Sequence, residues 1–263
     1  MVWLPDLHAG SNVGPLANPW PLTFEEAENV SYHSPSKQQK ELARNLSKFI
    51  GYAKKQASGK KLAVILGGDL RDGPIHHDSL QTFGDATSQE ALAIELLSPL
   101  TSSADELDAV RGSDPHAGDM AEADVRIARE LGVKEVPFIL RKDYGGVYIE
   151  ARHHTSTSRR EWMRGDSLRR LLKHTYYSNL RSGTRVPDLL LRGHVHLFDH
   201  EILPIYGGMQ GAVSGGWKLG DSYTATKDND LFSIGGVLFH TDTRRVECVD
   251  FTPKAVVRKA KDD

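Results

Sequence analysis

The chain has 263 residues, of which 39% are hydrophobic and 26% are charged, a balance that is typical of globular proteins with a substantial core. Its 33 basic and 35 acidic residues leave a formal net charge of −2, which excludes a global basic field for nucleic acid. The only cysteine, Cys248, excludes an intramolecular disulfide, and its alternating surroundings predict a buried structural thiol.

The chain shows no feature of a membrane protein. No apolar run approaches the length of a membrane span. The first candidate ligand is Asp6, which leaves no room for a signal peptide before it. We therefore expect a cytoplasmic protein that does not associate with a membrane.

The predicted elements begin with a short strand at 2–5, followed by an irregular segment at 9–33 that is rich in glycine and proline. A helix is expected to begin at Ser34 and Pro35, because serine is a good N-cap and proline suits the first helical position. An uninterrupted apolar run at 62–66 predicts a strand that is buried on both faces.

The later elements alternate between helices and strands up to about residue 191. A capping-box pattern at Thr87 and Glu90 predicts the start of a helix. It is followed by a strand at 107–110, a helix at 119–131, strands at 136–140 and 147–151 joined by a turn at 144–146, a helix at 166–181 and a strand at 186–191. Only strands are expected after that, around 203–213, 232–240 and 244–251. This order favours a single α/β domain, residues 1–263, with two packed sheets and helices outside them.

Candidate metal ligands follow the predicted strands. Asp6 and His8 come after the first strand, and in an extended chain residues i and i+2 point to the same side, so both can reach one metal. Taken alone, this pattern is more often a surface loop. Asp69 follows the strand at 62–66 through a Gly-Gly step, where a carboxylate is able to bridge two cations; the alternative is an aspartate that caps a turn. Asp72 is expected to be a neighbour of the site or a turn former.

Histidines follow two later strands. By the same alternation His194 and His196 should share one face, and Gly193 lets the backbone approach a metal closely. His153 and His154 are adjacent and should face opposite ways, so only one of them is expected to be a ligand. Imidazole suits zinc, iron, manganese or nickel, whereas carboxylates favour harder cations.

The loop at 111–116 follows another strand and contains Asp114, a potential oxygen ligand, and His116, which is able to protonate a leaving group. By itself, this loop is indistinguishable from an ordinary polar loop.

Together these motifs resemble the calcineurin-like metallophosphoesterase superfamily over roughly residues 2–200. The resemblance is carried by Asp-x-His at 6–8, Gly-Asp-x-x-Asp at 68–72, the strand-end histidine and Gly-His-x-His at 193–196. It is closest to bacterial and phage members with an Arg-Gly-Ser/Thr loop in place of the usual Gly-Asn-His. It implies an α/β (α+β) fold, a two-sheet β-sandwich flanked by helices.

The resemblance also implies a site with two divalent cations. One metal would be bound by Asp6, His8, Asp69 and His196, and the second by Asp69, His153 and His194, so that Asp69 bridges them. The asparagine ligand of the family is absent here. We assign its role to Asp114, with Ser113 as the rival, and the acid or substrate-binding role to His116.

The implied reaction is hydrolysis of a phosphomonoester or phosphodiester by a hydroxide held between the two cations. The metal would be manganese, iron, zinc or nickel, with manganese expected to work best in vitro. The partner is a phosphoester substrate, with nucleotides and nucleic acids among the candidates; the sequence does not identify its binding residues or the oligomeric state.

Other interpretations stay open. A group of basic residues with Trp162 among them either tracks a nucleic-acid backbone or forms a solvated helix face around a core tryptophan, and we favour the helix face. Its arginines are Arg152, Arg159, Arg160, Arg164, Arg169 and Arg170. His76 and His77 either line the pocket mouth or face solvent. The altered loop at 111–116 leaves room for a binding scaffold without turnover, and a single-metal enzyme on Asp6, His8, Asp69 and His196 is a third reading.

Overall fold

Two five-stranded sheets pack face to face in the computed structural model, which describes residues 1–23, 30–73, 82–155, 165–220 and 232–253. The first sheet consists of β1 (Val2–Leu4), β4 (Ala63–Leu66), β5 (Glu106–Ala109), β11 (Gly235–His240) and β12 (Arg245–Asp250), in the order β12-β11-β1-β4-β5. The second consists of β6 (Leu140–Tyr144), β7 (Val147–Ala151), β8 (Leu189–Arg192), β9 (Asp199–Leu203) and β10 (Met209–Val213), in the order β6-β7-β8-β10-β9.

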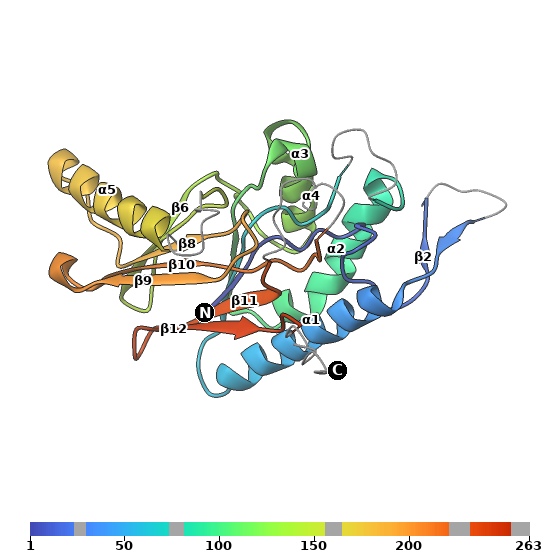
Figure 1. Cartoon of the computed structure of the whole chain (residues 1–263), viewed down its shortest axis with the longest axis horizontal. Helices are drawn as coiled ribbons and strands as arrows, with labels where there is room; N and C mark the ends of the chain where they lie inside the picture. Colours follow the sequence, from blue (N-terminus) through green and yellow to red (C-terminus); the bar gives the residue numbers. More distant parts are fainter. Residues whose placement is uncertain (24–29, 74–81, 156–164, 221–231, 254–263) are drawn as a thin grey trace, which may run out of the picture.

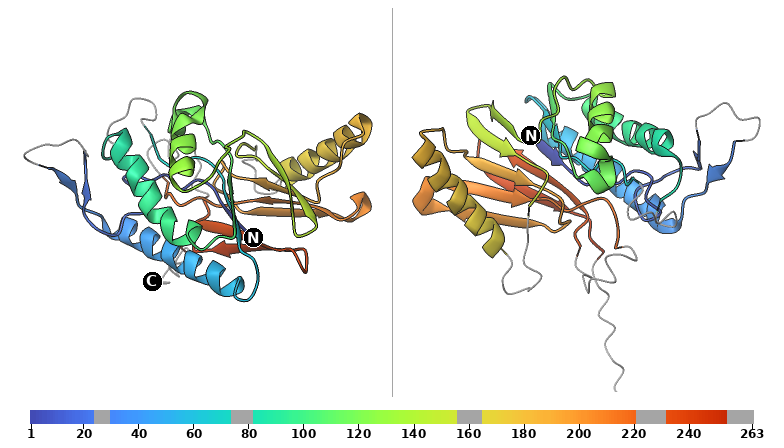
Figure 2. Two further views of the ribbon diagram at one scale, coloured as in Figure 1. Left: turned by 180° about the vertical axis from the view of Figure 1, so that it is seen from behind. Right: turned by 90° about the horizontal axis from the view of Figure 1, so that it is seen from above.

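Helices cover the outer faces of both sheets (Figures 1 and 2). The helices are α1 (Lys37–Gln56), α2 (Ala86–Thr101), α3 (Asp114–Ala117), α4 (Glu122–Glu130) and α5 (Asp166–Ser182), with 3-10 turns η2 (Asp119–Ala121) and η4 (Pro204–Tyr206). Two short paired strands, β2 (Trp20–Pro21) and β3 (Tyr32–His33), lie apart from the two sheets. The described helices include none that is long and apolar enough to cross a bilayer.

Alternation along the strands builds the layers. In β4, Ala63 and Ile65 belong to the core between the two sheets, whereas Val64 and Leu66 belong to the core beneath α1, α2 and α4. In β8, Leu190 instead belongs to the cluster with the apolar residues of α5. Successive side chains of a strand point to opposite faces, so an uninterrupted apolar run is what a strand between two apolar layers requires. The expected two-sheet sandwich flanked by helices is confirmed.

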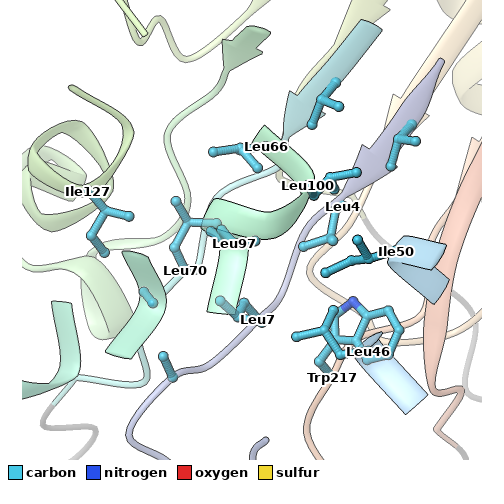
Figure 3. Close-up of a cluster of buried hydrophobic side chains, with 14 of the residues drawn as sticks. Leu4, Leu7, Leu46, Ile50, Leu66, Leu70, Leu97, Leu100, Ile127 and Trp217 are labelled. Atoms are coloured by element: carbon cyan, nitrogen blue, oxygen red, sulfur yellow. The ribbon is translucent and has the colours of Figure 1, made fainter. Parts of the chain in front are cut away.

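The core beneath the first sheet also anchors two of the predicted metal-binding loops. Leu7 lies between Asp6 and His8, and Leu70 follows Asp69; both side chains are fully buried. Figure 3 shows them within the same apolar cluster as Leu4 and the other labelled residues. Each loop therefore alternates a buried leucine with the polar residues that it presents on its other side.

The helix starts differ from the sequence predictions. Ser36 is the N-cap of α1, because its hydroxyl accepts the N–H of Gln39 while the Gln39 side chain accepts the N–H of Ser36. Helix α2 begins after Asp85, whose carboxylate accepts a backbone N–H in the first turn, rather than at Thr87.

The positions of two predicted strands also differ from those in the structure, because of the turns between strands. The prediction of a strand at 136–140 was wrong. The tight turn at Gly145 and Gly146 pairs Tyr144 with Val147, so the strand lies directly before that turn, at 140–144. The strand expected at 203–213 is two antiparallel strands, β9 and β10.

Cys248 is half-buried rather than fully buried, and burial raises the pKa of its thiol to about 11.

Candidate metal centre

The carboxyl ends of strands from both sheets meet at one site. β1 and β4 are parallel neighbours in the first sheet and lead to Asp6 and Asp69, and the Asp6 N–H donates to the carbonyl of Gly68 at 2.9 Å. β7 and β8 are parallel neighbours in the second sheet and lead to His153 and His194. The two edges are joined across the sandwich, because the N–H of His194 donates to Asp6 Oδ2 at 2.9 Å.

The first group of ligand atoms comes from Asp6, His8 and His196, all within 4.8 Å of one another. The Nε2 atoms of His8 and His196 are 2.9 Å apart, and Asp6 Oδ1 lies 3.3 Å from His196 Nε2. His8 Nδ1 is 2.9 Å from Asp72 Oδ1. An ionised carboxylate only accepts, so Nδ1 carries the imidazole proton and Nε2 presents a lone pair to the group.

The second group comes from Asp69, His153 and His194. His153 Nδ1 donates to the carbonyl oxygen of Gly67 at 2.8 Å. Its Nε2 is fully buried, 3.0 Å from Asp69 Oδ2 but without a hydrogen bond of normal geometry. A buried nitrogen that is oriented by its ring partner and lacks a well-directed partner of its own fits a metal ligand.

Asp69 lies where the groups meet. Besides the second group, its carboxylate belongs to a third one with His8 and His116. The N–H and hydroxyl of Ser113 donate to Asp69 Oδ1 at 2.6 and 2.9 Å. Burial opposes ionisation of Asp69, but the neighbouring His153, His116 and Ser113 outweigh it and hold the pKa of this carboxyl well below its usual value. A shared, ionised carboxylate in this position suits a bridging ligand.

The candidate ligands have strained backbones. Among the described residues other than glycine, five of the eight with left-handed φ angles are candidate ligands: Asp6 (56°), His8 (51°), Asp69 (51°), His194 (75°) and His196 (51°). Each such conformation costs about 1–3 kcal/mol and persists only where the surroundings enforce it, commonly at functional sites.

The left-handed backbone shows that the prediction from strand alternation was wrong for His194 and His196. His194 and His196 were expected to share one face, but the left-handed backbone turns them apart: His196 joins Asp6 and His8, whereas His194 joins Asp69 and His153. Asp6 and His8 do share a group, although a left-handed turn rather than strand alternation brings them together.

The structure distinguishes between the alternatives left open by the sequence. His153 is buried in the second group, whereas His154 is exposed beside His194, with ring centroids 4.8 Å apart. Asp114 is exposed at the start of α3 and lies outside all three groups, so this geometry does not support it as a ligand. Ser113, its rival, contacts Asp69 directly.

His116 faces the site from α3. Its Nδ1 is 2.8 Å from the carbonyl oxygen of Asp72, and its Nε2 lies 3.9 Å from Asp69 Oδ2.

Two arginines of the predicted basic group lie on a solvated helix face. Arg169 pairs with Glu201 and Arg170 with Asp166 along the exposed face of α5. Five predicted positions lie outside the described residues, together with Trp162: His76, His77, Arg159, Arg160 and Arg164.

Sequence reasoning missed Asp124, which joins two loops of the site. This fully buried carboxylate on α4 accepts the N–H groups of Asp69, Leu70 and Gly112, at 3.1, 2.9 and 2.8 Å. Burial, and then the charge of Asp69, raise the pKa of Asp124 to about 6. Nothing in the sequence distinguishes it from the other acidic residues of an amphipathic helix. A second missed residue is Lys218, whose Nζ donates to Asp72 Oδ1 at 3.0 Å.

No family model and no curated protein sequence matches the chain. Similar solved structures include an archaeal phosphodiesterase (10% identity, covering 95% of this chain and 98% of that one, TM-score 0.47). Others are YfcE, a phosphoesterase from E. coli (12%, 93% and 94%, 0.43), and Vps29 from Entamoeba histolytica complexed with zinc (14%, 95% and 98%, 0.40). The chain is similar in fold to known phosphoesterases. Because these TM-scores are below 0.5, its function has to be inferred from its own residues.

Metal binding is expected to release a proton from His153. Burial alone would lower the pKa of this imidazole, but the charges of Asp69 and Asp6 outweigh burial and raise it to about 10. At pH 7.5 the metal-free imidazole is therefore protonated and must lose its proton to become a ligand. Calorimetric titration with Mn²⁺ in buffers of different ionisation enthalpy measures this release.

His153→Gln is the comparison for that titration, and His174→Gln, on the exposed face of α5, is its control. We expect the release of about one proton to disappear in His153→Gln and to persist in His174→Gln. An undiminished release in His153→Gln would assign the proton to another group.

Proposed function

We propose that the protein is a metal-dependent phosphoesterase of the calcineurin-like metallophosphoesterase type, which hydrolyses phosphomonoesters or phosphodiesters with two divalent cations. The observation that carries this proposal is the convergence of two carboxylate–imidazole groups from four strand ends, with Asp69 in the second group and also within reach of His8 of the first. Nucleotides and nucleic acids are included among the candidate substrates.

The donor set fits two cations. Asp6, His8 and His196 would hold one, and Asp69, His153 and His194 the other. Asp69 also shares a group with His8, which supports it as the ligand that would bridge the two cations. Mixed imidazole and carboxylate donors suit manganese, iron, zinc or nickel. When bound, such a pair supplies positive charge to a phosphate and lowers the pKa of a bound water.

The chain's own residues orient the reacting groups. Asp72 fixes two imidazoles: its carboxylate accepts from His8 Nδ1, and its backbone carbonyl accepts from His116 Nδ1. His116 Nε2 is thereby directed towards Asp69, where it is in position to hydrogen-bond or protonate the leaving oxygen of a substrate. Ser113 holds the Asp69 carboxylate in place with two hydrogen bonds to Oδ1.

The test is hydrolysis of bis(p-nitrophenyl) phosphate and p-nitrophenyl phosphate by the metal-free protein after addition of Mn²⁺, Fe²⁺, Zn²⁺ or Ni²⁺. We expect turnover with at least one cation and two equivalents bound by elemental analysis. One equivalent with turnover would indicate a single-metal enzyme. Two bound equivalents without turnover on these esters, on cyclic nucleotides or on single- and double-stranded DNA would indicate a binding scaffold.

His116→Ala is expected to lower kcat by about 100- to 10,000-fold, because a positioned general acid contributes that much to a proton transfer. Bound metal should remain at two equivalents, since the two groups assigned as ligands do not include His116. His174→Ala, a histidine on the exposed face of α5, is the control and should leave kcat unchanged. Loss of bound metal in His116→Ala would make His116 a ligand instead.

A further inference from the structure

We propose that Lys218 is a positioning residue of the metal centre: through Asp72 it holds the His8 imidazole in the orientation and tautomer that present Nε2 to a cation. This inference rests on the proposed metal site and adds a residue that none of the sequence motifs contains.

The contacts form one buried chain. Lys218 Nζ lies 3.0 Å from Asp72 Oδ1 and 3.4 Å from Oδ2, and the same Oδ1 accepts from His8 Nδ1 at 2.9 Å. Asp72 is completely buried, and Lys218 retains only 5% of its exposure. The lysine therefore contacts both oxygens of the carboxylate that orients His8.

Without Lys218, the Asp72 carboxylate would lose a contact that reaches both of its oxygens. The ammonium group, together with the Ser11 side chain that also hydrogen-bonds Asp72, limits the rotation of the carboxylate, and this rotation decides where Oδ1 meets His8 Nδ1. A ring nitrogen that is bound in this way carries the proton, which leaves the other nitrogen as a ligand. Lys218 thus acts on His8 through Asp72, without touching a cation or substrate itself.

Neighbouring residues of Lys218 contact the same half of the site. The backbone N–H of Trp217 donates to the backbone carbonyl of Asp6 at 2.8 Å. A Cβ on Gly216 would lie 2.9 Å from the His196 ring, so the backbone passes directly against this imidazole. Residues 216–218, which follow β10, therefore contact Asp6 and His196, and reach His8 through Asp72.

None of these contacts involves His153 or His194, the ligands assigned to the second cation alone. Removing the lysine should consequently weaken one metal and spare the other. A general loss of structure would instead weaken both.

The first experiment titrates the metal-free full-length protein with Co²⁺, whose visible spectrum reports its ligands. We expect Lys218→Met to weaken one of the two equivalents by about 10- to 100-fold, the usual effect of removing a group that orients a ligand, and to spare the other. Lys142→Met is the matched control: this lysine also pairs with carboxylates, those of Asp108 and Glu106, but on the outer strand β6. It should bind Co²⁺ as the native chain does.

The second experiment reads the His8 tautomer without metal. In ¹⁵N-histidine NMR spectra of the metal-free chain we expect His8 with its proton on Nδ1, and a mixture of tautomers in Lys218→Met. His8→Gln assigns the signal. Should Lys218→Met fail to unfold cooperatively, Lys218→Gln, which retains a hydrogen-bond donor, takes its place in both experiments.

Unchanged Co²⁺ affinity together with an unchanged His8 tautomer would overturn the role of Lys218, and so would equal weakening of both equivalents. These readouts do not need turnover. A chain that binds two cations with the expected dependence on Lys218 but hydrolyses no ester would refute the proposed function and leave the role of Lys218 intact.

Discussion

Asp69→Asn should abolish phosphoester hydrolysis, with kcat/KM reduced by about 1,000-fold or more, and should lower the bound metal below two equivalents. Its carboxylate belongs to both the His153–His194 group and the His8–His116 group, so the amide removes a negative charge that the whole centre shares. A loss of about 4 kcal/mol in transition-state stabilisation corresponds to a factor of about 1,000. Elemental analysis and hydrolysis of bis(p-nitrophenyl) phosphate measure the two effects.

The matched control is Asp114→Asn, the same chemical change at the exposed carboxylate that the structure leaves outside the groups. It should keep both cations and activity within about twofold, in keeping with the small effects of surface substitutions. Full activity in Asp69→Asn would remove that residue from the site. Loss of a cation in Asp114→Asn would restore Asp114 as a ligand and displace Ser113 from that role.

Gly68→Ala should destabilise the metal-free protein by about 2–5 kcal/mol, or prevent folding. Gly68 has a φ of +85°, and a Cβ there would lie 2.4 Å from the nitrogen and 2.5 Å from the Cα of Gly112. The left-handed conformation costs a non-glycine residue about 1–2 kcal/mol, and overpacking adds about 1–3 kcal/mol. Both clashing atoms are backbone, so the loops that carry Asp69 and Ser113 must separate.

Gly146→Ala separates these two effects. Gly146 lies in the exposed turn between β6 and β7 with a φ of +84°, nearly that of Gly68, but a Cβ there would meet nothing within 4 Å. Its loss should be about 1–2 kcal/mol by urea unfolding without metal. Equal losses in the two variants would show that the loops yield and that their close approach does not matter for stability.

The buried strands along the chain, and the metal-ligand types of residue that follow them, can be recognised in the sequence. A buried strand needs apolar residues on both faces, so the runs that became β4 and β8 are visible without a structure. The Gly-Gly step before Asp69 and the glycine before His194 mark places where the backbone turns sharply and approaches other chain segments closely. These signals are local, and they picked out the members of both carboxylate–imidazole groups.

Which candidate ligands lie together was not a local property. The extended-chain rule placed His194 and His196 together, and left-handed φ angles separated them. Such angles are unfavourable for these residues by themselves, so only contacts made across the fold, such as the bond from the His194 N–H to Asp6, keep them. Ser113 and Asp114 differ in the same way, since the direction of one short helix decides which of them meets Asp69.

The residues that hold the loops of the candidate site lie outside its motifs. Asp124 is 55 residues from Asp69 along the chain, and Lys218 is 146 residues from Asp72. Both act through hydrogen bonds that exist only when the two sheets and α4 have packed, because burial raises the free energy of any polar group left without a partner. The sequence by itself determined the buried strands such as β4 and β8 and the chemical types that follow them. The packing of the sheets decided how these groups are paired, shared and oriented, because pairing depends on distances between segments that no local pattern encodes.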